Sequence, residues 1–185
     1  MVQTHELIAH PAFPPMSARR VAASFDQPEA GWIRLRWRIE GADRIVVPPF
    51  AGSRRKDGLW QATCGELFVA EPGETGTAGA YREFNFSPSE AWAAYRFAAY
   101  RTGDGNVRVG RPPVIAWRGR GQLALLDVWL ATDALPPPPW PYGMTMVIAE
   151  QGGIVSYWAA KHPGERPDFH DPACLAFNHA PPLPP

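Results

Sequence analysis

The sequence predicts an all-β fold, a single-domain antiparallel β-sandwich, and three observations support this. The chain has 185 residues, the usual length of one domain. It contains 22 Pro and 17 Gly, which divide it into short segments, and 8 Trp, a residue that fits a pleated, half-buried surface. Several segments alternate apolar and polar residues and are separated by turn residues, which is typical of a sandwich or barrel. We expect one domain over residues 1–180 and a Pro-rich tail over residues 181–185.

The clearest predicted strand runs from Ile33 to Ile39, where apolar residues alternate with three arginines. Residues Val21 to Phe25 predict the strand before it. In chain order, the other expected strands are 44–47, 63–70, 81–86, 92–101, 114–118, 122–131, 144–150, 154–158 and 173–177. The segment 89–100 is rich in Ala, a good helix former, but the aromatic residues and turn signals around it favour a strand.

Turn residues separate these strands. Asp104-Gly105 is a hairpin signal, and glycines at 119–121 and 152–153 indicate two further hairpins. Residues 71–79 are interpreted as a Gly-rich loop. No segment shows a long helical period with capping residues.

Charge and cysteine content exclude several classes of protein. Lys+Arg and Asp+Glu are both 18, so the chain lacks the positive surplus of a dedicated nucleic-acid binder. No run approaches the roughly 20 apolar residues of a membrane helix, and the N-terminus has no signal-peptide pattern. Cys64 and Cys174 are far apart in sequence and do not indicate a disulfide scaffold. We therefore expect a cytoplasmic protein with reduced thiols and with neither nucleic acid nor membrane as a partner.

Two carboxylates interrupt otherwise apolar strands, Glu66 in the strand 63–70 and Glu83 in the strand 81–86. An unpaired carboxylate in a sheet face is costly, so each must either face a wet cleft or pair with an arginine. Tyr81 and Asn85 share a strand face with Glu83. We expect both carboxylates and Asn85 to line one cleft, with Trp60 at its edge. The alternative is a structural pair with Arg82, Arg96 or Arg101.

Three stretches together resemble bacterial DOMON-like domains, which are relatives of the family 9 carbohydrate-binding modules. They are DGLWQATCGELFVA (57–70), YREFNFSPSEAWAAY (81–95) and YWAAKHPGERPDFHDPACLAF (157–177). The resemblance extends over roughly Val21 to Phe177 and implies a jelly-roll sandwich whose concave face binds a sugar or haem. Trp60 and Glu66 look like the aromatic–carboxylate pair of that family. Trp158, or as second choice Trp140, looks like its later aromatic residue.

The expected function is non-catalytic binding of a small molecule, a carbohydrate or a sugar-containing metabolite. Aromatic faces suit the apolar faces of pyranose rings, while carboxylates and amides suit the hydroxyls. The candidate ligand-binding residues are Trp60, Glu66, Tyr81, Glu83, Asn85, Arg101, Trp158 and His170.

Two alternatives stay open. The resemblance allows a haem-binding electron-transfer domain with Met and His ligands, for which Met144, Met146, His162 and His170 are available. The chain could also be a protein-interaction module whose partner docks on a sheet edge.

Enzymatic interpretations are weaker, because the sequence lacks GxSxG, HExxH and P-loop motifs. We assign no catalytic residue, no metal ligand and no resident cofactor. Pairing of Cys64 with His170, use of both glutamates as glycosidase carboxylates, and a zinc site within residues 162–171 are hypotheses of lower rank.

Overall fold

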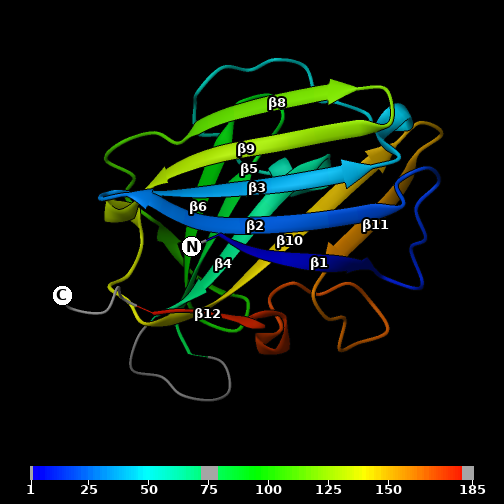
Figure 1. The fold of residues 1–185 in the computed structure, drawn as a ribbon. Helices are drawn as coiled ribbons and strands as arrows, with labels where there is room; N and C mark the ends of the chain where they lie inside the picture. Colours follow the sequence, from blue (N-terminus) through cyan, green and yellow to red (C-terminus); the bar gives the residue numbers. More distant parts are fainter. Residues whose placement is uncertain (1, 72–78, 181–185) are drawn as a thin grey trace.

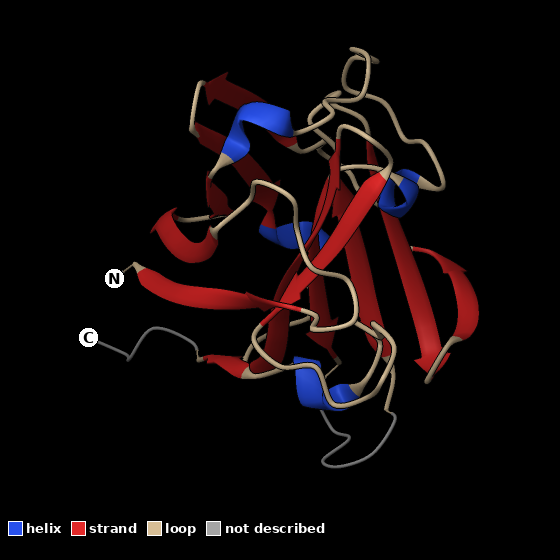
Figure 2. Ribbon diagram, turned by 90° about the vertical axis from the view of Figure 1, so that its right-hand side faces the viewer, coloured by secondary structure: helices blue, strands red, loops and turns tan. Residues whose placement is uncertain are grey.

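The computed structural model describes residues 2–71 and 79–180. The predicted tail at 181–185 and most of the predicted Gly-rich loop lie outside the described residues. In these two ranges, strands make up most of the regular structure, and the helical segments are short 3-10 turns (Figure 2). The strands are β1 (Gln3–Ala9), β2 (Arg20–Glu29), β3 (Trp32–Glu40), β4 (Cys64–Ala70), β5 (Tyr81–Phe86), β6 (Trp92–Ala99), β7 (Thr102–Asn106), β8 (Val114–Arg120), β9 (Leu123–Ala131), β10 (Trp140–Glu150), β11 (Ile154–Ala159) and β12 (Phe177–His179). The 3-10 turns are η1 (Ala42–Arg44), η2 (Leu59–Gln61), η3 (Thr132–Ala134) and η4 (Pro172–Cys174).

The strands pair in the order β7-β6-β5-β4-β10-β11-β1-β2-β3-β9-β8, and β12 pairs with β10. Each of these strand pairs is antiparallel. Strand β1 pairs with β2 along most of its length and with β11 at its end, so it joins two layers. Sheet A contains β2, β3, β8 and β9, and sheet B contains β4–β7 and β10–β12. The strands of the two layers cross at a large angle (Figure 1). The predicted antiparallel β-sandwich is confirmed.

The core lies between the two sheets. In β3, Ile33, Leu35, Trp37 and Ile39 are almost completely buried, and the intervening arginines point outward, where Arg34 pairs with Asp26 on β2. Sheet B contributes Leu67, Phe84, Phe86, Met144 and Met146 from its inner face. Gly65 is required here, because a Cβ at this position would lie 2.9 Å from Leu126 and 3.0 Å from Trp37 of sheet A.

Two predicted strands differ from the structure for local reasons. Residues 44–47 form the end of η1 and a single bridge between Ile45 and Glu150, because Pro48 and Pro49 have no N–H to continue a ladder. Residues 173–177 begin with η4, whose first turn is capped when Ala173 N–H donates to Asp171 (2.8 Å). Only the last of these residues, Phe177, enters a strand, β12.

Strand β1 and the turn before β7 were not predicted. Only Leu7 is buried in β1, so the alternation of apolar residues is weak there, and backbone pairing with two neighbours holds the strand. Asp104-Gly105 lies inside β7 beside a bulge. The turn falls instead at Tyr100-Arg101, where Arg101 adopts a left-handed conformation with φ of 51°. The Ala-rich segment after residue 89 forms strand β6, as predicted. Among the described residues, no helix is long and apolar enough to cross a membrane.

Candidate functional site

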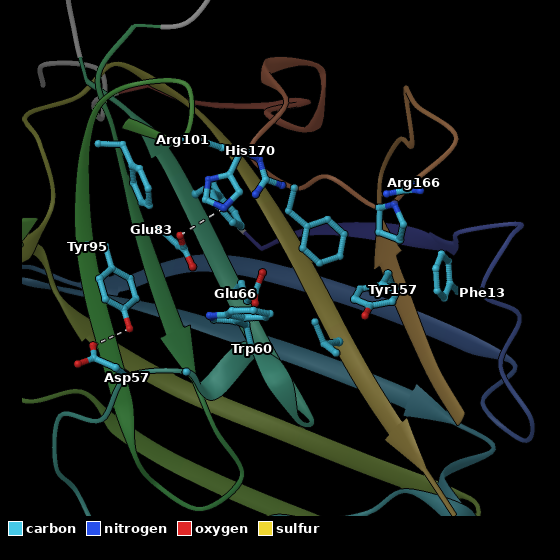
Figure 3. Close-up of a pocket in the computed structure, with 16 residues that line it drawn as sticks. Phe13, Asp57, Trp60, Glu66, Glu83, Tyr95, Arg101, Tyr157, Arg166 and His170 are labelled. Atoms are coloured by element: carbon cyan, nitrogen blue, oxygen red, sulfur yellow. Dashed lines mark hydrogen bonds and ion pairs between the residues drawn. The ribbon is translucent and has the colours of Figure 1, made fainter. Parts of the chain in front are cut away.

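A pocket of about 970 Å³ lies on the outer face of sheet B, the face turned away from the core (Figure 3). Alternation along β4 and β5 directs Glu66, Phe68 and Glu83 to this face, while Leu67 and Phe84 point into the core. The pocket is lined by Phe13, Asp57, Gly58, Trp60, Glu66, Phe68, Glu83, Tyr95, Phe97, Arg101, Val147, Tyr157, Arg166, Pro167, Phe169 and His170.

Two glutamates form the polar floor of this pocket. Glu66 on β4 lies opposite Asn85 on β5, and Phe68 lies opposite Glu83, so the glutamates are diagonal neighbours on adjacent strands. Their exposed fractions are 2% and 5%. The Thr145 hydroxyl on β10 donates a hydrogen bond to Glu66 Oε2 (3.2 Å), and Asn85 Nδ2 donates to Glu83 Oε1 (2.6 Å).

The arginines considered as structural partners bind other carboxylates. Arg82 and Arg96 both contact Glu71, at 3.1 and 3.0 Å, and Arg101 contacts Asp168 at 2.8 Å. Within residues 2–71 and 79–180, no basic nitrogen lies within 4.0 Å of Glu66, and Glu83 has only the His170 imidazole at 3.8 Å. The floor therefore carries two carboxyl groups without a cationic side chain in direct contact.

This burial changes the acidity of both groups. Burial raises the pKa of Glu66 well above its usual value, and the nearby Glu83 raises it further, against the effect of the Thr145 hydrogen bond. Burial also raises the pKa of Glu83, although the Asn85 hydrogen bond and the Arg101 charge oppose the shift. Two buried carboxylates on neighbouring strands repel each other, so protonation of at least one of them is favoured.

His170 covers one end of the floor. The Tyr81 hydroxyl oxygen accepts a hydrogen bond from the Arg101 backbone N–H (3.1 Å), and the hydroxyl lies 2.7 Å from His170 Nδ1, to which it can donate its own proton. The neutral imidazole then carries its proton on Nε2, which faces Glu83 Oε2 at 3.8 Å. Burial and the Arg101 charge lower the His170 pKa to about 4, against the attraction of Asp168. His170 therefore presents a neutral N–H donor to the pocket.

We expect the His170 imidazole to remain neutral, with the proton on Nε2, down to about pH 5 and to titrate near pH 4. Because its folded pKa lies below the unfolded value of 6.5, the unfolded state binds the proton first, and the folded state loses stability as the pH falls from about 6.5 to about 4. Nitrogen-15 NMR of the histidine side chains measures the tautomer and the pKa, and His170→Gln assigns the signal. Tyr81→Phe removes the donor to Nδ1 and should raise the pKa. Titration of the wild-type imidazole near 6.5 would contradict this arrangement.

Trp60 lies at the mouth of the pocket with 51% of its surface exposed. It belongs to η2, which follows Gly58, a residue in the left-handed conformation. Asp57, just before this turn, accepts a hydrogen bond from the Tyr95 hydroxyl on β6 (2.8 Å) and forms an ion pair with Arg55 (2.9 Å). In the view of Figure 3, the Trp60 ring lies next to Glu66, between Tyr95 and Tyr157.

The opposite wall contains aromatic residues that the sequence analysis did not assign to the site. Tyr157 on β11 contacts Phe13 from the β1–β2 loop and Phe169 from the β11–β12 loop, with ring centroids 5.2 and 6.1 Å apart. The period of two along residues 154–158 could have identified Tyr157, because it lies on the opposite strand face from Trp158. The two loop residues carry no such signal, since only the tertiary fold brings these loops to sheet B.

The structure brings most of the predicted binding residues together. Trp60, Glu66, Glu83, Arg101 and His170 line the pocket. Two further candidates, Tyr81 and Asn85, are buried just behind it and hold His170 and Glu83 in place.

The predicted later aromatic residue is placed elsewhere. Trp158 pairs with Met146 and faces the core between the sheets, where it is 4% exposed, and Trp140 is 2% exposed in the same core. The outward neighbour Tyr157 occupies the pocket instead of Trp158.

The residues considered for metal or haem ligation do not converge. Met144 and Met146 point into the core, whereas His170 lies over the outer face of sheet B, and His162 Nε2 bonds to the Ile8 carbonyl (2.9 Å). In the part of the chain that the structure describes, no three His, Cys, Asp or Glu side chains form a group that could hold a metal. Cys64 is completely buried and lies 3.5 Å from Asn85 Oδ1, and burial raises the pKa of its thiol.

Comparison of the sequence with protein-family models gave no match, and comparison with curated proteins gave none either. The chemistry of the pocket therefore carries the functional argument.

Proposed function

We propose that this chain binds a small molecule non-covalently in the pocket on the outer face of sheet B, and that the ligand is a carbohydrate or a sugar-containing metabolite. The observation that carries the proposal is the polar floor of Glu66 and Glu83 between walls of aromatic side chains. We further propose that the ligand is bound in the cytoplasm, where the free Cys64 and Cys174 remain reduced.

The size and lining of the pocket fit this class of ligand. A volume of about 970 Å³ is near the upper end of the range of roughly 300–1,000 Å³ for small-molecule sites, so more than one sugar ring has room. Trp60 and Tyr157 offer exposed aromatic faces to the apolar faces of pyranose rings. The carboxyl groups and the His170 Nε2–H offer acceptors and donors for ring hydroxyls.

We expect Trp60→Ala to weaken sugar binding by about 5- to 30-fold, because burial of an aromatic face against a sugar ring is worth about 1–2 kcal/mol. The half-exposed side chain supports the core little, so the melting temperature should stay within a few degrees of wild type. Phe50→Ala is the matched control, since Phe50 is an aromatic residue that is 77% exposed and does not line the pocket. Equal affinity in wild type and Trp60→Ala would place the ligand elsewhere.

A thermal-shift screen of mono- and disaccharides tests the proposed function directly, because a ligand that binds only the folded state raises the melting temperature. The absorption spectrum of the purified protein distinguishes the haem alternative, since bound haem gives an intense Soret band. A melting temperature that no sugar changes, together with a protein partner protecting a sheet edge from hydrogen exchange, would favour the interaction-module alternative.

A further inference from the structure

The floor of the pocket has an excess of carboxyl groups that a neutral sugar would leave uncompensated. Glu66 and Glu83 are both more than nine-tenths buried, both line the pocket, and neither has a lysine or arginine in contact among the described residues. A buried carboxylate is retained at low cost only where a cation or several donors reach it.

The cationic side chains of the pocket are committed to other groups or lie at its rim. Arg101 Nη2 donates to Asp168 Oδ1 (2.8 Å), and Asp168 also receives the Tyr100 hydroxyl, so this arginine is anchored to the β11–β12 loop. Arg166 lies in the exposed part of that loop, at the edge of the pocket (Figure 3). His170 is held as a neutral donor by Tyr81.

We infer that the natural ligand carries a protonated amine, as an amino sugar does, and that its ammonium group binds between Glu66 and Glu83. This inference rests on the proposed function of the pocket as a small-molecule site. Thr145 and Asn85 leave one oxygen on each carboxyl group, Glu66 Oε1 and Glu83 Oε2. An ammonium group has three N–H donors, so it can donate to both of these oxygens and keep one donor for water or another part of the ligand.

The walls of the pocket favour the same charge. The electron-rich faces of Trp and Tyr attract a cation within about 6 Å of the ring centroid. Figure 3 shows Trp60 next to Glu66, with Tyr95 and Tyr157 on either side in that view. Arg55 already lies over the Tyr95 ring, with its Cζ 5.3 Å from the centroid, so Trp60 and Tyr157 are the rings left for a cation of the ligand.

Proton release on binding predicts the direction in which the affinity for an amine changes with pH. The ammonium group arrives charged, and the carboxyl pair releases to solvent the proton that it held. Affinity for benzylamine, which stays protonated throughout, should therefore rise as the pH rises from about 5 to about 7. Affinity for an amino sugar should rise in the same direction until its less basic amine begins to lose its own proton. The other titratable or charged groups facing the pair are Cys64 on β4, Tyr81 on β5, Tyr95 on β6, Asp57 before η2, Arg101 in the β6–β7 turn, Tyr157 on β11, and Arg166, Asp168 and His170 in the β11–β12 loop.

The experiment compares β-1,4-linked disaccharides that differ only at C2. They are the disaccharides of glucosamine (ammonium), N-acetylglucosamine (neutral amide) and glucose (hydroxyl). Benzylamine and benzyl alcohol form a second matched pair without a sugar. Calorimetric titration at about pH 5 and about pH 7, in two buffers of different ionisation enthalpy, measures affinity and proton release together.

We expect the glucosamine disaccharide to bind about 10- to 150-fold more tightly than both neutral disaccharides, with a proton released on binding. Glu66→Gln and Glu83→Gln should each abolish most of this preference, whereas Glu29→Gln, at an exposed position on sheet A, should keep it. Thermal melts of each variant show whether it folds, and using two pocket variants keeps the test valid if one does not.

The outcomes separate the two proposals. Equal or tighter binding of the neutral disaccharides overturns the ammonium inference and leaves the sugar-binding function standing. Binding of benzylamine, but of no sugar and not of benzyl alcohol, supports the ammonium site and overturns the choice of sugar. Binding of none of the five compounds overturns the ammonium inference.

Discussion

Glu66→Gln is expected to raise the free energy of unfolding by about 1–3 kcal/mol at neutral pH, the usual cost of burying an uncompensated polar group. The same change should weaken ligand binding by about 10- to 150-fold, because it removes a charge-assisted hydrogen bond. Glutamine keeps the shape of the side chain and can still accept from Thr145, which donates to Glu66 at 3.2 Å. If the replacement stabilises the fold and weakens binding, Glu66 is present for its role in binding and not for stability.

The stability gain should depend on pH in a defined direction. Burial raises the folded pKa of Glu66 well above the usual 4.5, so below pH 4.5 the group is protonated in both states and contributes no difference. As the pH rises above 4.5 the unfolded state ionises first, and the wild type becomes progressively less stable relative to Glu66→Gln.

Chemical denaturation of wild type and Glu66→Gln across this pH range measures the effect, with Glu29→Gln as the exposed control. A Glu66→Gln protein that is strongly destabilised, yet binds ligand normally, would show that Glu66 is a structural residue and remove it from the binding site.

Glu150→Ala is expected to lower the free energy of unfolding by about 2–4 kcal/mol, equivalent to a fall in melting temperature of roughly 5–15 °C. Glu150 is 1% exposed at the end of β10 and holds the turn that leads into β2. Its carboxylate accepts from the backbone N–H of Met16 (2.7 Å), Ser17 (2.7 Å) and Ala18 (3.1 Å), and from the Ser17 hydroxyl (2.6 Å). Alanine leaves these donors without their acceptor.

The contribution of Glu150 should disappear in acid. Burial alone would raise its pKa, but the hydrogen bonds from Ser17, Met16 and Ala18 outweigh this and hold the pKa below the usual 4.5. Its stabilising effect is therefore complete above pH 4.5 and is lost as the pH falls through the lowered folded value. The difference between wild type and Glu150→Ala should shrink accordingly, while Glu165→Ala, at an exposed position, should change little at any pH. A difference that stays constant down to acid pH would show that the charge of Glu150 is not what holds the turn.

Much of the fold and part of the site could be predicted from local patterns. Alternation of apolar side chains identified β3, β5 and β9 to within one residue at each end. Successive side chains of a strand point to opposite faces, so a strand with one buried face shows a period of two in its sequence. The same period placed Tyr81, Glu83 and Asn85 on one face of β5. The cost of an unpaired carboxylate in a sheet pointed to Glu66 and Glu83 before any strand pairing was known.

The tertiary structure decided which of these groups meet and what surrounds them. Strand β4 lies between β5 and β10, so Thr145 reaches Glu66 from a strand nearly eighty residues away. Side chains alternate between the two faces of β11, and the pairing of β11 with β10 decides which face is which. Trp158 therefore points into the core and Tyr157 into the pocket.

Part of the pocket wall comes from loops and a 3-10 turn that carry no periodic signal of their own, and it includes Phe13, Trp60 and Phe169. The sequence by itself therefore determined the strands, the faces of the strands and the two acidic positions, because these depend on neighbours along the chain. Only the tertiary structure decided that the two acidic positions form one floor without a cation in contact, because this depends on pairing between segments far apart in the sequence. The same pairing directs Arg101 to Asp168, and Arg82 and Arg96 to Glu71.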